Sequence, residues 1–126
     1  MVRLRASATL GVVARYCDRT MIERVVLIKL KPEYATDSQR AAVVQTTETT
    51  LPDAVGVRAL RVATPADGRT RRDWDICIQV VLDDLDAVER YRVDKVHRAY
   101  ADVFLRPMMA KIHVFNFERP GPVDAG

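Results

Sequence analysis

The 126-residue sequence has only two cysteines, two histidines and one tryptophan. Cys17 and Cys77 form no Cys-x-x-Cys pair, which argues against a structural zinc site or a thiol redox motif. Two histidines without a suitable carboxylate spacing do not predict a metal centre. The sequence also lacks a glycine-rich nucleotide loop and a serine or cysteine nucleophile motif. We therefore expect no metal and no other cofactor, and the scarcity of cysteine fits a reducing cytoplasm.

Long apolar runs are missing as well, because no segment approaches the ~18 residues of a membrane span. The formal net charge of +3 comes entirely from the first 20 residues, where four arginines oppose Asp18 alone. Acidic and basic residues are equal in number over the rest of the chain. A nucleic-acid-binding domain should carry a basic face, and this domain shows none. We expect neither a membrane nor a nucleic acid as partner.

The length fits one domain. We expect residues 1–20 to be an N-terminal extension, residues 21–118 the folded domain, and residues 119–126 a flexible tail rich in proline and glycine. Met21 would then be the functional start of the domain. A signal peptide is the alternative for the extension, but its apolar run from Ala6 to Ala14 is short and no clear cleavage site follows.

Hydrophobic periodicity divides the domain into four strands and two helical regions. The strands are expected at residues 22–31, 57–64, 72–83 and 111–118. The first helix should begin at the capping box Thr36-x-x-Gln39 and reach about Leu51. The second helical region should begin after Asp84, break near Asp94 and end at Pro107. In its later part the apolar spacing predicts one buried face, formed by Val96, Tyr100, Val103 and Phe104. The order β-α-β-β-α-β predicts an α+β, ferredoxin-like fold with a four-stranded antiparallel sheet and helices on one face.

Both faces of the predicted sheet are apolar. In the first strand Val26, Ile28 and Leu30 alternate with Val25 and Leu27. The third strand is similar, and its helix-facing side is predicted to carry Trp74, Ile76, Ile78, Val80 and Leu82. Helices can cover only one face, and the other would be too large an apolar patch for a monomer. We therefore expect two copies to pack sheet to sheet as a homodimer.

Tyr91 and His97 are candidate catalytic residues. His97 has an ordinary pKa of ~6.5, so it can exchange a proton near neutral pH. A chain break near Asp94 would turn the Tyr91 hydroxyl toward it as a hydrogen-bond donor. The structural alternative is a core tyrosine with a satisfied hydroxyl and a histidine that caps a helix start.

The candidate pocket is lined from the first strand by Arg24, Val26 and Ile28. Arg24 would hold a carboxylate or other anion at the pocket mouth, or else extend into water from a strand start. The remaining candidate ligand-binding residues are Trp74, Ile76, Tyr100 and Phe104, which core packing explains equally well.

Five segments, taken in order, resemble the stress-responsive A/B barrel (Dabb) family. They are I-E-R-V-V-L-I-K-L-K, V-x-A-L-R-V, W-D-I-C-I-Q-V-V-L-D-D-L-D-A-V-E-R-Y, D-K-V-H-R-A-Y and I-H-V-F-N-F-E, which together span roughly residues 21–118. The resemblance implies a dimeric α+β barrel. The family includes polyketide cyclases in which a tyrosine and a histidine, spaced as Tyr91 and His97 are, act on the substrate between helices and sheet. Those cyclases carry further histidines, and Arg24 and Ile76 stand at the matching positions here.

Three functional hypotheses remain. The first is a small cofactor-free dimer with a hydrophobic pocket, acting as a cyclase or isomerase on an aromatic or polyketide-like molecule. The second is a stress-responsive or ligand-binding dimer without catalysis, whose pocket is filled by Trp74, Tyr100 and Phe104. The third is a cofactor-independent monooxygenase.

Overall fold

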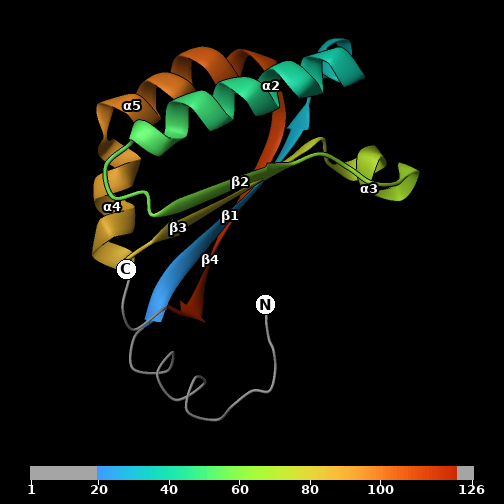
Figure 1. Cartoon of the computed structure of the whole chain (residues 1–126). Helices are drawn as coiled ribbons and strands as arrows, with labels where there is room; N and C mark the ends of the chain where they lie inside the picture. The colour runs from blue at the N-terminus through green and yellow to red at the C-terminus, as the bar shows by residue number, and fades with distance from the viewer. Residues whose placement is uncertain (1–19, 122–126) are drawn as a thin grey trace, which may run out of the picture.

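The computed structural model describes residues 20–121 and shows a curved antiparallel sheet beneath one layer of helices (Figure 1). The strand order is β2-β3-β1-β4, so the two ends of the domain pair in the sheet. The strands are β1 (Thr20–Leu30), β2 (Ala59–Ala63), β3 (Ile76–Leu82) and β4 (Met109–Pro120). The ferredoxin-like α+β fold is confirmed. The expectations for residues 1–19 and 122–126 lie outside the described residues.

The helical layer consists of one long helix and a chain of short helical segments. These are η1 (Pro32–Tyr34), α2 (Asp37–Thr50), η2 (Leu51–Asp53), α4 (Leu85–Val93), α5 (Lys95–Arg98), the π-helical η3 (Ala99–Leu105) and η4 (Arg106–Met108). The short α3 (Gly68–Asp73), between β2 and β3, projects beyond the end of the sheet apart from this layer (Figure 1). The Thr36 side chain caps α2 by accepting from the Gln39 amide at 3.1 Å, as the sequence predicts. The expected break near Asp94 is confirmed, because Asp94 ends α4 and caps α5.

The predicted third strand is too long. Residues 68–73 form α3 instead, because the Asp67 carboxylate accepts from the Thr70 amide at 2.8 Å and starts a helical turn. Trp74 follows α3 and precedes β3, which begins only at Ile76. The strand alternation therefore does not extend back to Trp74.

The predicted apolar face of residues 96–104 is only partly correct. Tyr100 is buried, but Val103 is 75 % exposed. Residues 99–105 form a π-helix, whose wider turn rotates successive side chains differently from the α-helical spacing assumed in the prediction. Val103 therefore points to the surface.

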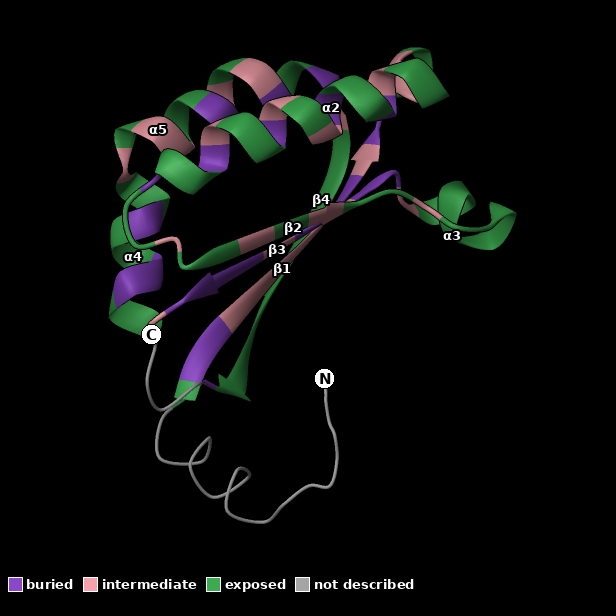
Figure 2. Ribbon diagram, in the orientation of Figure 1, coloured by how far each residue is buried: buried purple, intermediate pink, exposed green. Residues whose placement is uncertain are grey.

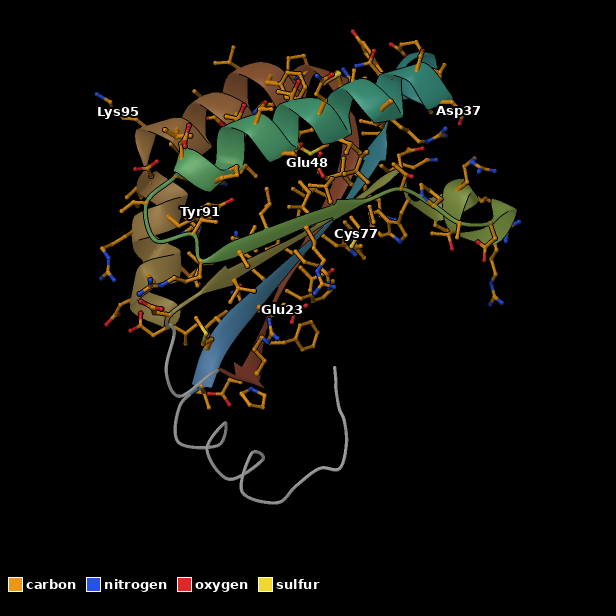
Figure 3. All side chains as sticks on the ribbon, in the orientation of Figure 1. Glu23, Asp37, Glu48, Cys77, Tyr91 and Lys95 are labelled. Carbon is orange, nitrogen blue, oxygen red and sulfur yellow. The ribbon has the colours of Figure 1, made fainter. Side chains whose placement is uncertain are left out.

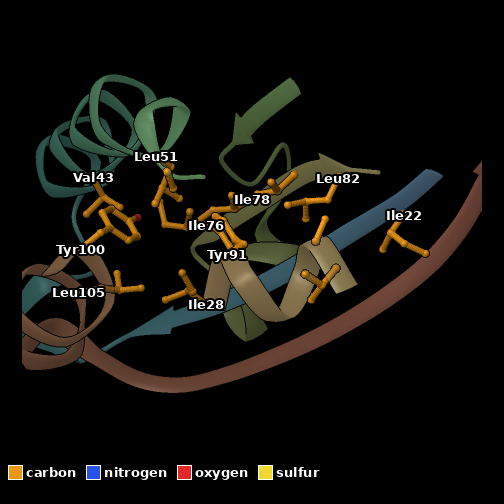
Figure 4. Packing of buried hydrophobic residues seen from close by; sticks show 14 of the residues in the cluster. Ile22, Ile28, Val43, Leu51, Ile76, Ile78, Leu82, Tyr91, Tyr100 and Leu105 are labelled. Carbon is orange, nitrogen blue, oxygen red and sulfur yellow. The ribbon is translucent and has the colours of Figure 1, made fainter. Parts of the chain in front are cut away.

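The core lies between the helical layer and the central strands (Figures 2 and 4). It is made by the helix-facing residues of β1 and β3 packed against α2, η2, α4 and η3, and includes Ile28, Val43, Leu51, Ile76, Ile78, Leu82, Val88, Tyr91, Tyr100 and Leu105. The edge strand β4 is exposed over residues 110–120. The helices thus cover β1 and β3 and leave the surface of β4 open.

Candidate functional site

The corner between α4 and α5 brings Tyr91 and His97 together. The centroids of their rings lie 4.4 Å apart, with the planes tilted by 44°. Asp94 makes the corner, because its amide donates to the Tyr91 carbonyl at 3.2 Å while its carboxylate accepts from the Val96 amide at 3.0 Å. In Figure 3, Tyr91 lies on the side of α4 that faces the sheet. The expected proximity of the two side chains is therefore present.

The backbone determines which nitrogen of His97 carries the proton. Nδ1 lies 3.1 Å from the carbonyl oxygen of Arg92. A carbonyl oxygen only accepts hydrogen bonds, so Nδ1 donates and Nε2 of the neutral ring keeps its lone pair. Nε2 is thus the nitrogen available to take a proton.

Burial keeps both side chains neutral. Tyr91 is 3 % exposed, and burial raises the pKa of its hydroxyl well above the ordinary value, so the hydroxyl stays protonated as a hydrogen-bond donor. Burial also lowers the pKa of His97, an effect that the positive charges of Arg24 and Arg98 reinforce. The Arg92 carbonyl and Asp102 oppose this lowering. At neutral pH the site therefore presents a hydroxyl donor beside an uncharged imidazole.

Arg24 lies in the middle of β1, on the face of the sheet turned toward the helices. It pairs with the buried Val80 of β3 on one side and with Asn116 of β4 on the other. Its Nη1 donates to Asn116 Oδ1 at 3.1 Å. Partial burial lowers the pKa of the guanidinium, and its charge interacts with Tyr91. Arg24 therefore belongs to the same site as the Tyr91–His97 pair.

The other predicted lining residues of this face fall into two groups. Val26 is half-buried and pairs with Val114, which is 38 % exposed, so an open apolar surface continues from Arg24 along β1 and β4. Ile28 and Ile76 pair with each other and are fully buried, at 0 % and 1 % exposed. They form the floor of the core beneath the site.

Tyr100 and Phe104 also lie inside the helical layer. The Tyr100 hydroxyl shares a hydrogen bond with the hydroxyl of Thr47, and the Phe104 ring lies 5.5 Å from that of Tyr100. Tyr100 is 4 % exposed, and its one polar group is satisfied within the protein. These two side chains pack against the core, with Phe104 at its margin.

Trp74 lies on the opposite face from the one predicted. Its ring centroid is 5.0 Å from that of His113, and Lys111 Nζ lies 5.1 Å from it. His113 pairs with Leu27, whose neighbour Ile28 points into the core, so His113 and Trp74 lie on the face turned away from the helices. Trp74 therefore does not line a pocket with Tyr91, and the prediction that placed it there is wrong.

Two polar groups were not assigned a role from the sequence. Asn116 accepts a hydrogen bond from the Arg24 side chain. The sequence feature that could have indicated this role is the polar Asn116 in the otherwise apolar alternating series Ile112, Val114, Asn116. Asp75 is fully buried and accepts from both Arg40 and the Leu30 amide. The sequence feature that could have indicated this buried role is a carboxylate residue within an apolar run.

Two hollows of the described surface lie away from the Tyr91–His97 pair. One of about 430 Å³ lies between α2 and the segment after β2, and Arg40, Glu48 and Arg71 contribute to its wall. Another of about 270 Å³ lies beside Trp74 and Cys77. Among residues 20–121 no cluster of three or more histidine, cysteine or acidic side chains is arranged to hold a metal ion. No helix in that range has the length and apolarity needed to cross a membrane.

Comparison with known proteins identifies a family whose members share this fold. The profile of the stress-responsive A/B barrel domain (Dabb) matches residues 22–119. None of the curated proteins matches the chain.

Solved structures with the same fold come from several organisms. A Dabb family protein from Mesorhizobium loti is 19 % identical, with a TM-score of 0.67 over 79 % of this chain and 96 % of its own. A dimeric protein of unknown function from Bacteroides fragilis is also 19 % identical, with a TM-score of 0.64, and the match covers 79 % of this chain and 96 % of that protein. The hydroxynitrile lyase of Passiflora edulis is 12 % identical, with a TM-score of 0.63, and the match covers 79 % of this chain and 93 % of that protein. At such identities these likenesses show the fold alone.

Proposed function

We propose, because the chain belongs to the stress-responsive A/B barrel domain (Dabb) family, that it is a homodimer with one small-molecule site in each subunit. The site lies at the α4–α5 corner and performs acid–base chemistry without a cofactor. The reaction class is a cyclisation or isomerisation of an aromatic or polyketide-like ketone. The observation that carries this proposal is the packing of the ring of the buried Tyr91 against the ring of the neutral His97, with centroids 4.4 Å apart.

The two side chains take complementary roles in this chemistry. Nε2 of His97 removes a proton from the carbon next to a carbonyl group, while the Tyr91 hydroxyl donates a hydrogen bond to the carbonyl oxygen as negative charge develops there. Where the ketone carries a β,γ double bond the product is a dienolate, and return of the proton to its γ-carbon completes an isomerisation to the conjugated ketone. Attack of the enolate carbon on a second carbonyl of the same molecule, with the proton passing to the new alkoxide, completes an aldol closure.

The open face of the sheet supports the homodimer. The face turned away from the helices carries Leu27, Trp74, Phe115 and Phe117, and the last two are 45 % and 56 % exposed. The structure of similar fold from Bacteroides fragilis is of a dimeric protein. A second copy on this face would remove these side chains from water.

A ligand-binding dimer without turnover is the second candidate. It is favoured by the way Ile28, Ile76 and Tyr100 fill the interior beneath the site, which leaves the open surface of β1 and β4 for a ligand. The fold itself accommodates catalysis, since the hydroxynitrile lyase of Passiflora edulis shares it. Turnover is therefore what separates the two candidates.

The experiment follows proton abstraction directly. The full chain is incubated in D₂O with 4-phenylbutan-2-one, and deuterium uptake beside the carbonyl is measured by NMR. We expect wild type to accelerate exchange and both Tyr91→Phe and His97→Gln to reduce the acceleration by about 100-fold or more. The matched controls Tyr34→Phe and His113→Gln should retain it.

Equal exchange by wild type and both site variants would overturn the catalytic proposal. Binding of the ketone without exchange would indicate the ligand-binding dimer. Oxygen consumption with a quinol substrate would indicate a monooxygenase instead.

A further inference from the structure

The guanidinium of Arg24 has more hydrogen-bond donors than partners. A guanidinium carries five N–H donors, and within residues 20–121 only Nη1 has a partner, the neutral Asn116 amide. No acidic side chain of the described chain forms an ion pair with it. Glu89 raises the pKa of Arg24, but this is the smallest of the four effects on it. The positive charge is therefore uncompensated at a half-buried position.

Arg40 shows how this chain satisfies an arginine that serves only the fold. Its Nε and Nη2 lie 3.0 and 2.9 Å from Asp75 Oδ1, and its Nη1 lies 3.0 Å from Asp37 Oδ1. Every nitrogen of that guanidinium has an acceptor. Arg24 has nothing comparable, and because β1 begins at Thr20 it does not stand at a strand start from which its head would extend freely into water. This difference in hydrogen-bond partners between Arg40 and Arg24 indicates that Arg24 is available to bind an acceptor outside the chain.

We propose that Arg24 binds the carboxylate of the ligand, so that the substrate is an apolar or aromatic keto acid. This inference rests on the proposed function, since it concerns the same site. Nε and Nη2 form the edge of the guanidinium that accepts both oxygens of a carboxylate. Val26 and the exposed Ile112 and Val114 lie on the same face of the sheet beside it and would contact the apolar part of the ligand. The charge of Arg24 lowers the pKa of both Tyr91 and His97, so the three side chains lie in one region and the ketone would lie near the last two.

Binding of the acid also changes His97. The charged groups that act on His97 are Arg24 from β1 and Arg98 and Asp102 from its own helical segment, while Tyr91 of α4 contacts its ring. Arg24 lowers the pKa of His97, so a carboxylate that compensates Arg24 raises that pKa toward its ordinary value. The imidazole thus becomes a stronger base only when the acid is bound.

The test compares two probes that differ in one charge. The full chain is titrated with 3-phenylpropionate and with 3-phenylpropionamide, and binding is followed through the NMR resonances of His97 and Tyr91. We expect wild type to bind the carboxylate at least about tenfold more tightly than the amide, as for a charge-assisted hydrogen-bonded pair. Arg24→Gln should abolish the preference, Arg24→Lys should keep part of it, and the control Arg69→Gln, on the exposed α3, should keep all of it.

The pH titration of His97 supplies a second readout, assigned with the His113→Gln variant. Its pKa should rise when the carboxylate is bound and stay unchanged with the amide. Equal affinity for the two probes, or an Arg24→Gln variant that keeps the preference, would overturn the carboxylate inference while leaving the proposed site intact, since the amide still reports binding beside Tyr91 and His97. If neither probe perturbs these residues, both proposals fail.

Discussion

Among single residues, Arg40 and Asp75 form the most deeply buried charge pair of the described chain. Asp75 is 0 % exposed and Arg40 6 %. One carboxylate oxygen of Asp75 accepts from Arg40, and the other accepts from the Leu30 amide at 2.8 Å. Lys29 Nζ adds a contact at 3.3 Å. The pair joins α2 to the start of β3 and the end of β1, so it locks the helix onto the sheet.

Replacement of Asp75 by alanine should therefore destabilise the protein strongly. It leaves a buried guanidinium with only Asp37 and the Ala35 carbonyl as partners, and a buried amide without its carboxylate acceptor. Breaking such a pair costs about 3 kcal/mol or more of unfolding free energy. Urea unfolding at one fixed protein concentration measures the loss. Glu89→Ala, which removes only the exposed ion pair with Arg92, should cost less than about 1 kcal/mol. Similar losses for the two variants would contradict this account.

At the scale of elements, the two aspartates that begin α4 and α5 both cap a helix with their carboxylates, with different consequences. Asp84 accepts from the Ala87 amide at 2.7 Å and starts α4. Asp94 accepts from the Val96 amide at 3.0 Å and starts α5. Only Asp94 also ends the preceding helix, and the change of direction there is what lets Tyr91 and His97 face each other.

Variants that lack the Asp84 or the Asp94 cap should distinguish an effect on stability from an effect on the geometry of the site. Asp84→Ala and Asp94→Ala should each lower the unfolding free energy by about 1 kcal/mol, because each loses one helix cap. Only Asp94→Ala should change the NMR resonances of His97, which feel the Tyr91 ring 4.4 Å away. The same spectral change in both variants, or in neither, would show that Asp94 does not position the pair.

Elements that depend on local signals were predictable. The Thr36 cap and the break at Asp94 follow from side chains that satisfy the backbone amides two or three residues along the chain. Trp74 and Val103 were placed on the wrong faces because each prediction continued a regular period through a segment that leaves it. The short α3, whose Asp67 cap was read as part of a loop, and the π-helical turn of η3 interrupt those periods, and the π-helical turn has no strong local signature.

At the scale of the whole molecule, the sheet has one covered and one uncovered face. Rings of Trp74, His113, Phe115 and Phe117 follow one another along the uncovered face, with successive centroids 5.0, 6.1 and 6.3 Å apart. A monomer would leave this row in water. Burial of about 800 Å² on each partner is typical of a stable interface.

Sedimentation of the full chain should give twice the monomer mass of 14.2 kDa at micromolar concentration. Phe117→Glu should shift the protein toward the monomer, because it places a charge within the buried interface. Val103→Glu is the matched control, since Val103 is 75 % exposed on the helical layer and should leave the mass unchanged. A wild-type protein that sediments as a single subunit would overturn the dimer.

The sequence by itself determined the order of the four strands and the two main helical regions, the ferredoxin-like class and the surplus of apolar residues on the sheet. Hydrophobic periodicity and helix caps act over a few residues and suffice for these features. It also pointed to Tyr91 and His97, which the corner at Asp94 brings together. Only the tertiary structure decided that Arg24 is held by Asn116, that Asp75 lies buried against Arg40, and that Trp74 lies on the far face. Each of these depends on strand register or on packing between residues distant in the chain. No local pattern encodes such contacts, because they form only when the layers meet.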